Sequence, residues 1–260
     1  MFQSTTLSLN IPSRLGLEDQ RIWEKSWYFL GRAAVEAAAP LLFRMDIARQ
    51  AAIPAGAKIL AANHPSTIDP VMLTTLVPEQ VGILISETLF KVPGLGRSLR
   101  MAGHIPVEEG RGQACLESGV RYLQAGRTVG IFPEGAISPL EGGLHRAHTG
   151  VARLALAAGV PVIPIGFALE RQNLRLVETV VDGRRETGTW YLHGAYAITV
   201  GEPMRLKGNL EGRAQVRAAA GQVMERIAQL SRESALRLET ARRRNTAGRW
   251  QSPAQDEALA

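Results

Sequence analysis

The stretch KILAANHPSTIDP, residues 58–70, joins a short apolar run to the first turn of a helix. KILAAN has the length of a buried strand, and Pro65 disfavours its continuation past His64. Asp69 followed by Pro70 is a common helix start, because Asp caps free N–H groups and proline has none to cap. The stretch therefore predicts a strand that ends at His64 and a helix that begins near Asp69.

Similar strand and helix patterns continue along the chain. Further apolar runs of strand length are VGILIS, GHIPV, TVGIFP, VPVIPIGFAL and, late in the chain, WYLHGAYAITVGEP. Helical patterns lie at 70–77, 113–125 and 149–158. This alternation predicts an α/β fold with a mixed, largely parallel sheet that is flanked by helices. His193 and Tyr196 fall in the last run, so we expect both to be strand residues.

One long helix is expected at each end of this α/β region. Residues 18–43 are typical of an amphipathic helix that contacts a membrane, because aromatic and cationic side chains are interleaved there. Residues 211–240 have apolar residues at spacings of four and three, which places them on one face of a long C-terminal helix. We therefore expect an N-terminal amphipathic segment at 1–50, a main domain at 51–245 and a disordered tail at 246–260.

Composition excludes several classes of protein. The 260 residues contain one cysteine, Cys115, which excludes an internal disulfide and a zinc site built mainly on thiolates. No apolar run of 18 residues is free of charge and no signal-peptide pattern is found, so we expect no membrane span. The formal charge of +6 equals the excess of nine Arg over three Glu within 213–249. A basic end attracts anionic lipid or nucleic acid. Because only 5% of residues are aromatic and no stacking motif occurs, we expect no nucleic-acid partner.

His64 and Asp69 are the strongest candidates for chemistry. An Asp beside an imidazole fixes its tautomer and stabilises the imidazolium, which leaves the second ring nitrogen free to accept a proton. Asp69 is equally well explained as a helix cap, and the two roles are compatible. Ser66 is a poor candidate for a nucleophile, because it lies two residues from His64 and no G-x-S-x-G motif occurs. A hydroxyl group of the substrate would then be the nucleophile.

Two further segments have patterns that suit ligand contact. FPEGAIS, residues 132–138, places Glu134 and Gly135 in a tight turn directly after an apolar strand. Residues 87–112 combine glycines with cations, a composition that suits an anion such as a phosphate. These cations include Lys91, Arg97 and Arg111. Each segment alone also fits an ordinary turn or a solvated helix.

Taken in order, four segments resemble the motifs of the glycerolipid acyltransferase family, which includes bacterial 1-acylglycerol-3-phosphate acyltransferase. They are NHPSTID, KVPGLGRSLRMAGHIPV, FPEGAIS and GVPVIPIGF, within about residues 58–167. The resemblance implies that 51–245 is an acyltransferase domain. Such a domain moves an acyl group from a thioester, on coenzyme A or acyl carrier protein, to a hydroxyl acceptor of the lipid or glycerol-derived class. It implies no metal ion and no cofactor besides the acyl donor.

The resemblance also implies roles for single residues. His64 corresponds to the general base and Asp69 to its orienting partner. Glu134 and Gly135 correspond to positions for acceptor binding and site shape, and Pro164 to a position near the acyl or acceptor pocket. The cationic residues expected to contact substrate are Lys91, Arg97, Arg111, Arg146 and His148.

Two departures from the family pattern concern the acceptor. The family usually has an arginine where this chain has Glu109, and another where it has Ile137. Neither supplies the bidentate phosphate contact of a guanidinium, so a neutral or differently charged acceptor is an alternative to a phosphate-bearing one. A hydrolase with the same His–Asp pair and an accessory lipid-binding protein are further alternatives. Because helix 18–43 and the basic end suit a lipid interface, we expect a cytoplasmic protein that is peripheral on the inner face of the cell membrane.

Overall fold

The structure is a computed structural model that describes residues 17–249. Its helices are α1 (Leu17–Leu42), α2 (Asp69–Thr74), α3 (Glu87–Phe90), α4 (Leu95–Met101), α5 (Gly112–Gln124), α6 (Gly150–Ala158) and α7 (Arg213–Arg249), with a short 3-10 turn η1 (Arg171–Asn173). Its strands are β1 (Phe43–Arg49), β2 (Ile59–Ala62), β3 (Val81–Ser86), β4 (Ile105–Val107), β5 (Thr128–Ile131), β6 (Val162–Leu169), β7 (Leu174–Val181), β8 (Arg184–Tyr191) and β9 (Gly194–Val200). The tail expected at 246–260 is therefore helical as far as Arg249, and its remainder lies outside the described residues.

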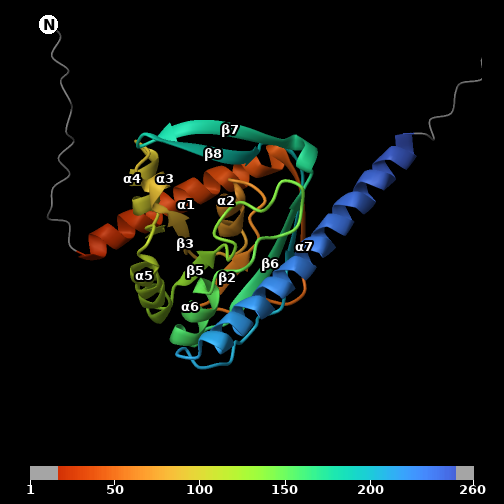
Figure 1. The fold of residues 1–260 in the computed structure, drawn as a ribbon. Coiled ribbons are helices and arrows are strands. Elements are labelled where there is room, and N and C mark those ends of the chain that lie inside the picture. The colour runs from red at the N-terminus through yellow and green to blue at the C-terminus, as the bar shows by residue number, and fades with distance from the viewer. Residues whose placement is uncertain (1–16, 250–260) are drawn as a thin grey trace, which may run out of the picture.

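Within the described residues, seven strands form one sheet in the order β1-β9-β6-β2-β5-β3-β4 (Figure 1). Neighbouring strands are parallel except for β6 and β9, which are antiparallel. The expected mixed, largely parallel sheet with flanking helices is therefore confirmed. Strand β2 lies between β5 and β6, so the loop that follows it leaves the centre of the sheet at a carboxyl edge, where α/β proteins commonly place their sites.

Two expectations for the strands were wrong. The helix expected at 18–43 is present as α1, but the residues that follow it, up to Arg49, form β1, which pairs in parallel with β9. The sheet therefore begins before residue 51, inside the segment that was expected to be separate and helical. The run at 190–203 forms the end of β8 and all of β9, so Tyr196 is a strand residue whereas His193 lies between the two strands.

Strands β7 and β8 form a hairpin that the sequence did not indicate. Figure 1 shows it at the top of the molecule, above α1 and reaching toward α3 and α4. Its base is attached to the loop after β2, because the Thr67 N–H donates to Thr189 O at 2.7 Å. Near its tip, the Asp182 carboxylate lies 3.7 Å from the ammonium of Lys91, the residue that follows α3. The hairpin therefore forms a wall beside the segment that contains His64 and Asp69.

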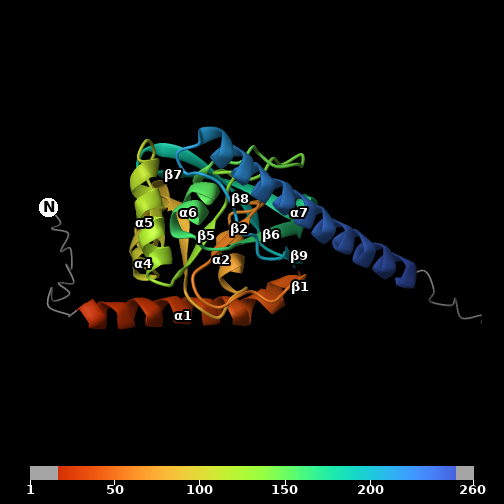
Figure 2. The same cartoon turned by 90° about the horizontal axis from the view of Figure 1, so that it is seen from below.

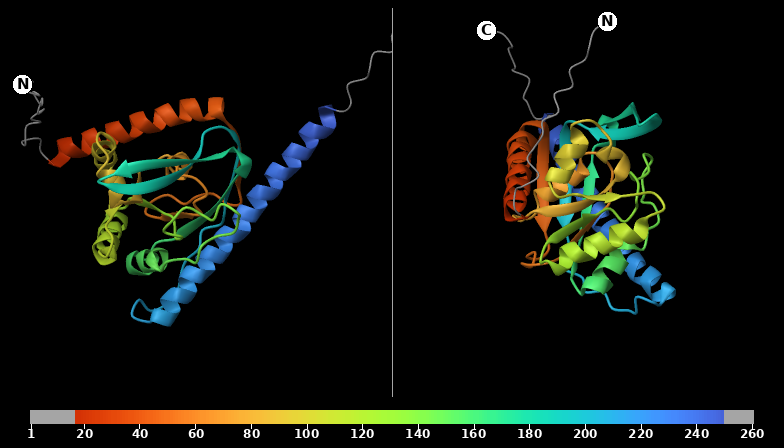
Figure 3. Two further views of the ribbon diagram at one scale, coloured as in Figure 1. Left: turned by 45° about the horizontal axis from the view of Figure 1, so that its top comes forward. Right: turned by 90° about the vertical axis from the view of Figure 1, so that its left-hand side faces the viewer.

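Helices cover both faces of the sheet, as Figures 2 and 3 show. Alternate residues of β2 point to opposite faces, as the pleat of a strand requires. Leu60 and Ala62 pack into a core that includes residues of α1 and α2. Ile59 and Ala61 pack into a second core with residues of α5, α6 and α7. Strand β2 is thus buried on both faces, which explains its continuous apolar sequence.

Helix α7 packs against β6 at very short range. A Cβ atom at Gly166 would lie 2.1 Å from the backbone nitrogen of Ser231, so only glycine permits this approach. The hydroxyl of Ser231 donates to Phe167 O at 3.1 Å, and that of Ser234 donates to Gly166 O at 2.9 Å. The residues predicted for the inner face of this helix are all buried: Val216, Ala220, Val223, Ile227 and Leu230. The helix therefore supports the strands that carry the loop with His64.

Candidate active site

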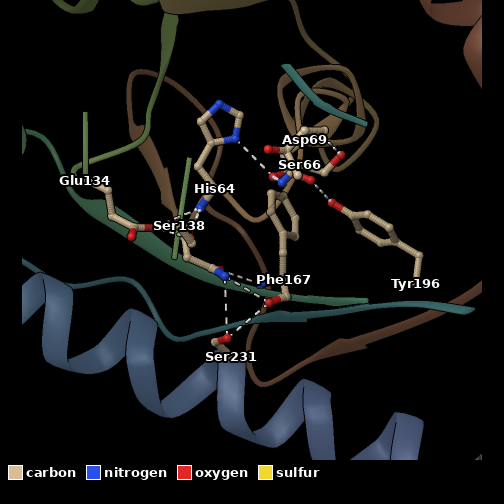
Figure 4. Close-up of polar contacts among 10 residues, drawn as sticks. His64, Ser66, Asp69, Glu134, Ser138, Phe167, Tyr196 and Ser231 are labelled. Carbon is tan, nitrogen blue, oxygen red and sulfur yellow. Dashed lines mark hydrogen bonds and ion pairs between the residues drawn. The ribbon is translucent and has the colours of Figure 1, made fainter. Parts of the chain in front are cut away.

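Asn63 fixes the point at which the chain leaves β2. Its side-chain oxygen accepts the Phe167 N–H at 2.7 Å, and its amide donates to Phe167 O at 3.0 Å. Ser231 contacts the same carbonyl from α7. This buried amide continues the pairing of β2 with β6 beyond the end of the strand, so the backbone of His64 starts from a rigid support (Figure 4).

His64 and Asp69 form the pair that the sequence predicted. His64 Nδ1 lies 3.0 Å from Asp69 Oδ2, and the Asp69 side chain is fully buried. The same oxygen accepts the Ser66 N–H at 2.7 Å, and the hydroxyl of Tyr196 donates to Asp69 Oδ1 at 2.6 Å. An ionised carboxylate can only accept, so these contacts place the proton of the imidazole on Nδ1. Nε2 is then the nitrogen with a free lone pair, and Figure 4 shows it on the side of the ring away from Asp69.

Burial and hydrogen bonding act in opposite directions on this pair. Burial raises the pKa of Asp69, and the hydrogen bonds from His64, Tyr196 and the Ser66 N–H oppose that rise. Burial and the neighbouring Asp69 carboxylate raise the pKa of Tyr196 well above its ordinary value, so its hydroxyl keeps its proton and remains a donor. The surroundings of Asp69 therefore consist of donors that suit a carboxylate.

The His64 ring is held on its face as well as at its edge. It stacks on Phe132 with ring centroids 4.2 Å apart and an angle of 22° between the planes. Of the His64 side chain, 17% is exposed, whereas Asp69 is not exposed at all. The imidazole is thus accessible while its partner carboxylate is shielded from water, an arrangement that would suit a general base.

Glu134 holds the backbone around His64. Its side chain is 2% exposed. Oε1 accepts the His64 N–H at 3.0 Å and the Ser138 hydroxyl at 2.6 Å, and Oε2 accepts the His145 N–H at 2.7 Å. The Ser138 N–H in turn donates to His64 O at 2.8 Å. This geometry gives Glu134 a supporting role, and the contact with an acceptor that the resemblance implied stays a prediction.

The structure changes the interpretation of two other residues in the motif. Asp69 is the first residue of α2, where Ile68 occupies the N-cap position and no side-chain cap is formed. The Asp69 carboxylate turns back toward His64, so the helix-cap interpretation was wrong. Ser66 is fully buried, and its hydroxyl donates to Thr189 O at 3.0 Å. A buried hydroxyl that is already engaged is unsuited to nucleophilic attack.

The turn after β5 contains Gly135 and lies against the loop that contains Arg146 and His148. Gly135 has a φ of 70°, a conformation that favours glycine. A Cβ atom there would lie 2.8 Å from the His148 ring. Arg146 is exposed, and it lies two residues before His148 and directly after His145. The exposed side of the Pro-Glu-Gly turn thus faces a basic loop, and the substrate contacts expected of these residues stay predictions.

The other expected contacts lie elsewhere. Arg97 is an exposed residue of α4, exposed Lys91 directly follows α3, and exposed Arg111 directly precedes α5. Lys91 lies 3.6 Å from Glu87, and Arg111 lies 3.0 Å from Glu108, both measured between charged atoms. Pro164 is buried in β6, where it is the register partner of Ala61. Contact of these four residues with a substrate also stays a prediction.

The sequence did not predict the hydrogen bond from the Tyr196 hydroxyl to Asp69. Tyr196 was expected to be part of a late strand, which is correct, but the alternation of a strand does not indicate what a buried hydroxyl will contact. Thr189 was missed for the same reason, because its backbone carbonyl binds both Ser66 and Thr67 from a hairpin that was not expected. Cys115 is buried in α5, in agreement with its expected place in the core.

The part of the chain that the structure describes has no group of three His, Cys, Asp or Glu side chains that could hold a metal ion. In the same residues, no helix combines the length and the hydropathy needed to cross a bilayer.

Comparison with known proteins finds similarity over the segment that contains His64 and Asp69. Residues 44–168 match the family model described as Acyltransferase. Over 111 residues the chain is 25% identical to the 1-acyl-sn-glycerol-3-phosphate acyltransferase of Bacillus subtilis, a match that covers 42% of this chain and 54% of that protein. Over 125 residues it is 26% identical to the protein of the same name from Escherichia coli, with 46% and 51% covered. The chain thus spans about half the length of the curated relatives that it matches.

A solved structure has a similar fold. The crystal structure of the 1-acyl-sn-glycerophosphate (LPA) acyltransferase from Thermotoga maritima matches with a TM-score of 0.55 and 21% sequence identity. The match covers 83% of this chain and 82% of that chain. The expected fold class is confirmed by this similarity, and the resemblance drawn from the four motifs is confirmed by the family match, since all four lie inside residues 44–168.

Proposed function

Because residues 44–168 belong to the acyltransferase family, we propose that this protein moves a fatty acyl group from an acyl thioester to a hydroxyl group of a glycerolipid-type acceptor. The observation that carries the proposal is the pair of His64 and Asp69. A buried carboxylate fixes one nitrogen of the imidazole at 3.0 Å, and the ring remains partly exposed. A base without a protein nucleophile requires a hydroxyl group from the substrate.

The residues support a direct transfer. His64 Nε2 accepts the proton of the acceptor hydroxyl while the hydroxyl oxygen attacks the carbonyl carbon of the thioester. The tetrahedral adduct then expels the thiolate, which takes the proton from the imidazolium, so the products are an ester and a free thiol. Asp69 keeps the other proton on Nδ1 and stabilises the imidazolium between these two steps. Coenzyme A and acyl carrier protein both supply such a thioester, and the scheme uses no further cofactor.

The acceptor is less closely defined than the reaction. Glu109 and Ile137 stand where the family usually has phosphate-binding arginines. We propose that the basic loop with Arg146 and His148 contacts the acceptor, because His148 lies against Gly135 beside the buried Glu134. A glycerolipid with an uncharged head group is the alternative acceptor, since a single exposed guanidinium gives weaker phosphate selection than two.

One experiment tests the proposed reaction and its alternatives. Purified protein is incubated with acyl-coenzyme A and a total lipid extract, free thiol is measured, and lipids are identified by mass spectrometry. Acyl transfer requires thiol release that depends on the acceptor and is lost in His64→Ala. Free fatty acid in place of an acylated lipid would identify a hydrolase. Lipid binding without thiol release would identify an accessory protein and would refute the proposal.

We propose further that α1 rests on a lipid surface, with the protein on the cytoplasmic, inner face of the cell membrane. Several large apolar side chains of α1 are exposed: Ile22, Trp23, Trp27, Phe29, Leu30, Leu41 and Leu42. The opposite side of the helix is anchored, because Tyr28 is buried and its hydroxyl accepts the Val81 N–H at 3.1 Å. An anchored helix with an exposed apolar and aromatic surface suits the interface of a bilayer.

A further inference from the structure

Tyr196 connects a distant strand to the proposed base. It lies in β9, outside residues 44–168, and is separated from Asp69 by 127 positions in the sequence. Its side chain is fully buried, and its ring packs near the rings of Phe43, Phe167 and Tyr191. The hydroxyl donates to Asp69 Oδ1 at 2.6 Å (Figure 4).

We propose that Tyr196 is a positioning residue of the acyl transfer, whose hydroxyl keeps the Asp69 carboxylate ionised and oriented toward His64. The inference rests on the proposed function, because a positioning residue matters only if His64 acts as the base. It extends the catalytic machinery beyond the His–Asp pair to a residue of β9 that the family match doesn't include.

The division of contacts between the two oxygens of Asp69 supports this role. The Ser66 N–H and His64 Nδ1 both contact Oδ2. Tyr196 donates to the other oxygen, Oδ1. If only the first two contacts were present, the carboxylate could turn about its Cβ–Cγ bond and its buried Oδ1 would lack this donor. With all three, the plane of the carboxylate is fixed, and so is the direction in which it faces the imidazole.

The same contact controls how the pair takes up a proton. The titratable groups that face Asp69 are His64 and Tyr196, and Tyr191 in turn faces Tyr196. Donation from Tyr196 lowers the pKa of Asp69, against the rise that burial causes. Without the Tyr196 hydroxyl, the pair of neutral His64 and ionised Asp69 is less stable. The pair that carries one more proton is less affected, because its negative charge is already balanced. The pair then takes up its proton at a higher pH, and the active form is lost sooner as the pH falls.

The test compares Tyr196→Phe with a matched control, Tyr191→Phe. Both substitutions remove one hydroxyl from a fully buried tyrosine and keep the ring. The Tyr191 hydroxyl donates to Ala195 O at 2.8 Å, so its loss leaves the contacts of Asp69 intact. The full chain of each variant is assayed by thiol release from acyl-coenzyme A with a total lipid extract, over a range of about pH 5 to 9. Thermal unfolding of each variant is measured in parallel.

We expect Tyr196→Phe to lower kcat about tenfold or more, as for the loss of a hydrogen bond to a charged group, with KM within about twofold. The acidic limb of its pH profile should move to higher pH, and Tyr191→Phe should leave both quantities unchanged. Equal kcat values and equal acidic limbs in the two variants would overturn the proposal, because a purely structural hydroxyl affects both proteins alike.

Two further measurements separate failure of this inference from failure of the proposed function. The variant His64→Ala should release no thiol. If the wild-type protein also releases no thiol with any acceptor, the proposed acyl transfer itself is contradicted. NMR titration of the His64 ring reports the pair without any reaction. If the midpoint of proton uptake by the pair is the same in wild type and Tyr196→Phe, Tyr196 does not influence Asp69, and the inference is refuted whatever the enzyme does.

Discussion

Glu134→Gln distinguishes a carboxylate that holds the site from one that contacts the acceptor. Three donors converge on Glu134: the His64 N–H, the Ser138 hydroxyl and the His145 N–H. A glutamine replaces one oxygen by an NH2 group, so at least one of these donors must face another donor. The arrangement that disturbs least places the NH2 group against the His145 N–H, which lies 2.7 Å from Oε2.

The loss of stability expected for Glu134→Gln follows from the number of hydrogen bonds that the Glu134 carboxylate accepts. Losing one hydrogen bond to a charged acceptor costs about 1.5–3 kcal/mol, and the remaining two bonds weaken when the charge is removed. We therefore expect Glu134→Gln to lower the free energy of unfolding by about 3 kcal/mol. For a protein of this size, that change corresponds to a decrease in Tm of about 6–12 °C. Because the His64 backbone loses part of its support, kcat should also fall, with little change in the KM for the acceptor.

Thermal unfolding followed by circular dichroism, and thiol release at a temperature below both transitions, measure these effects. Glu141→Gln is the matched control, because Glu141 is exposed in the same loop. The opposite pattern would refute the reasoning: an unchanged Tm together with an acceptor KM that rises tenfold or more would show that the Glu134 carboxylate faces the acceptor after all.

Three other predictions follow from the described contacts. Asp69→Asn should lower kcat about 10³-fold, because an amide cannot accept from both sides and the imidazole loses its fixed tautomer; thiol release within tenfold of wild type would contradict this. Trp23→Ser combined with Leu30→Ser should reduce binding to anionic vesicles in a sedimentation assay, since both side chains are exposed on α1, and unchanged binding would exclude this surface. Burial lowers the pKa of His104 from 6.5 to about 4, so the unfolded chain binds the proton first and the free energy of unfolding should fall by about 3 kcal/mol between pH 6.5 and 4. Denaturant titrations should show that His104→Gln loses that slope, and an identical slope in both proteins would assign it to other groups.

The sequence predicted those parts of the fold that depend on local pattern. Strand β2, the loop with His64 and the start of α2 are contiguous, so one stretch of thirteen residues, 58–70, contains all the information needed to place them. The inner face of α7 was predictable for the same reason, because an apolar repeat of the helical period must be buried. Both predictions depend only on neighbours within a few residues.

The elements that were missed depend on partners that are far away in the chain. Strand β1 directly follows α1 without a turn signal, and it becomes a strand because β9 pairs with it. The hairpin of β7 and β8 is mostly exposed along β7, so it lacks the alternation that indicates a half-buried strand. It is attached beside the site by the backbone hydrogen bond from Thr67 to Thr189, which no periodicity predicts.

The burial of Glu134 likewise depends on a partner that is far away in the chain, the His64 N–H. A glutamate in a Pro-Glu-Gly turn normally points to solvent, and only the convergence of three segments around it provides enough donors to bury its charge. The site therefore uses two buried carboxylates for different tasks. Glu134 holds the backbone of His64, and Asp69 orients its ring. The apolar side chain of Ile137, one of the positions where this chain departs from the family pattern, can take part in neither set of hydrogen bonds. The pair of His64 and Asp69 can thus be retained while the acceptor contacts change, and we expect substitutions at Ile137 to alter the choice of acceptor without affecting the proposed proton transfer at His64.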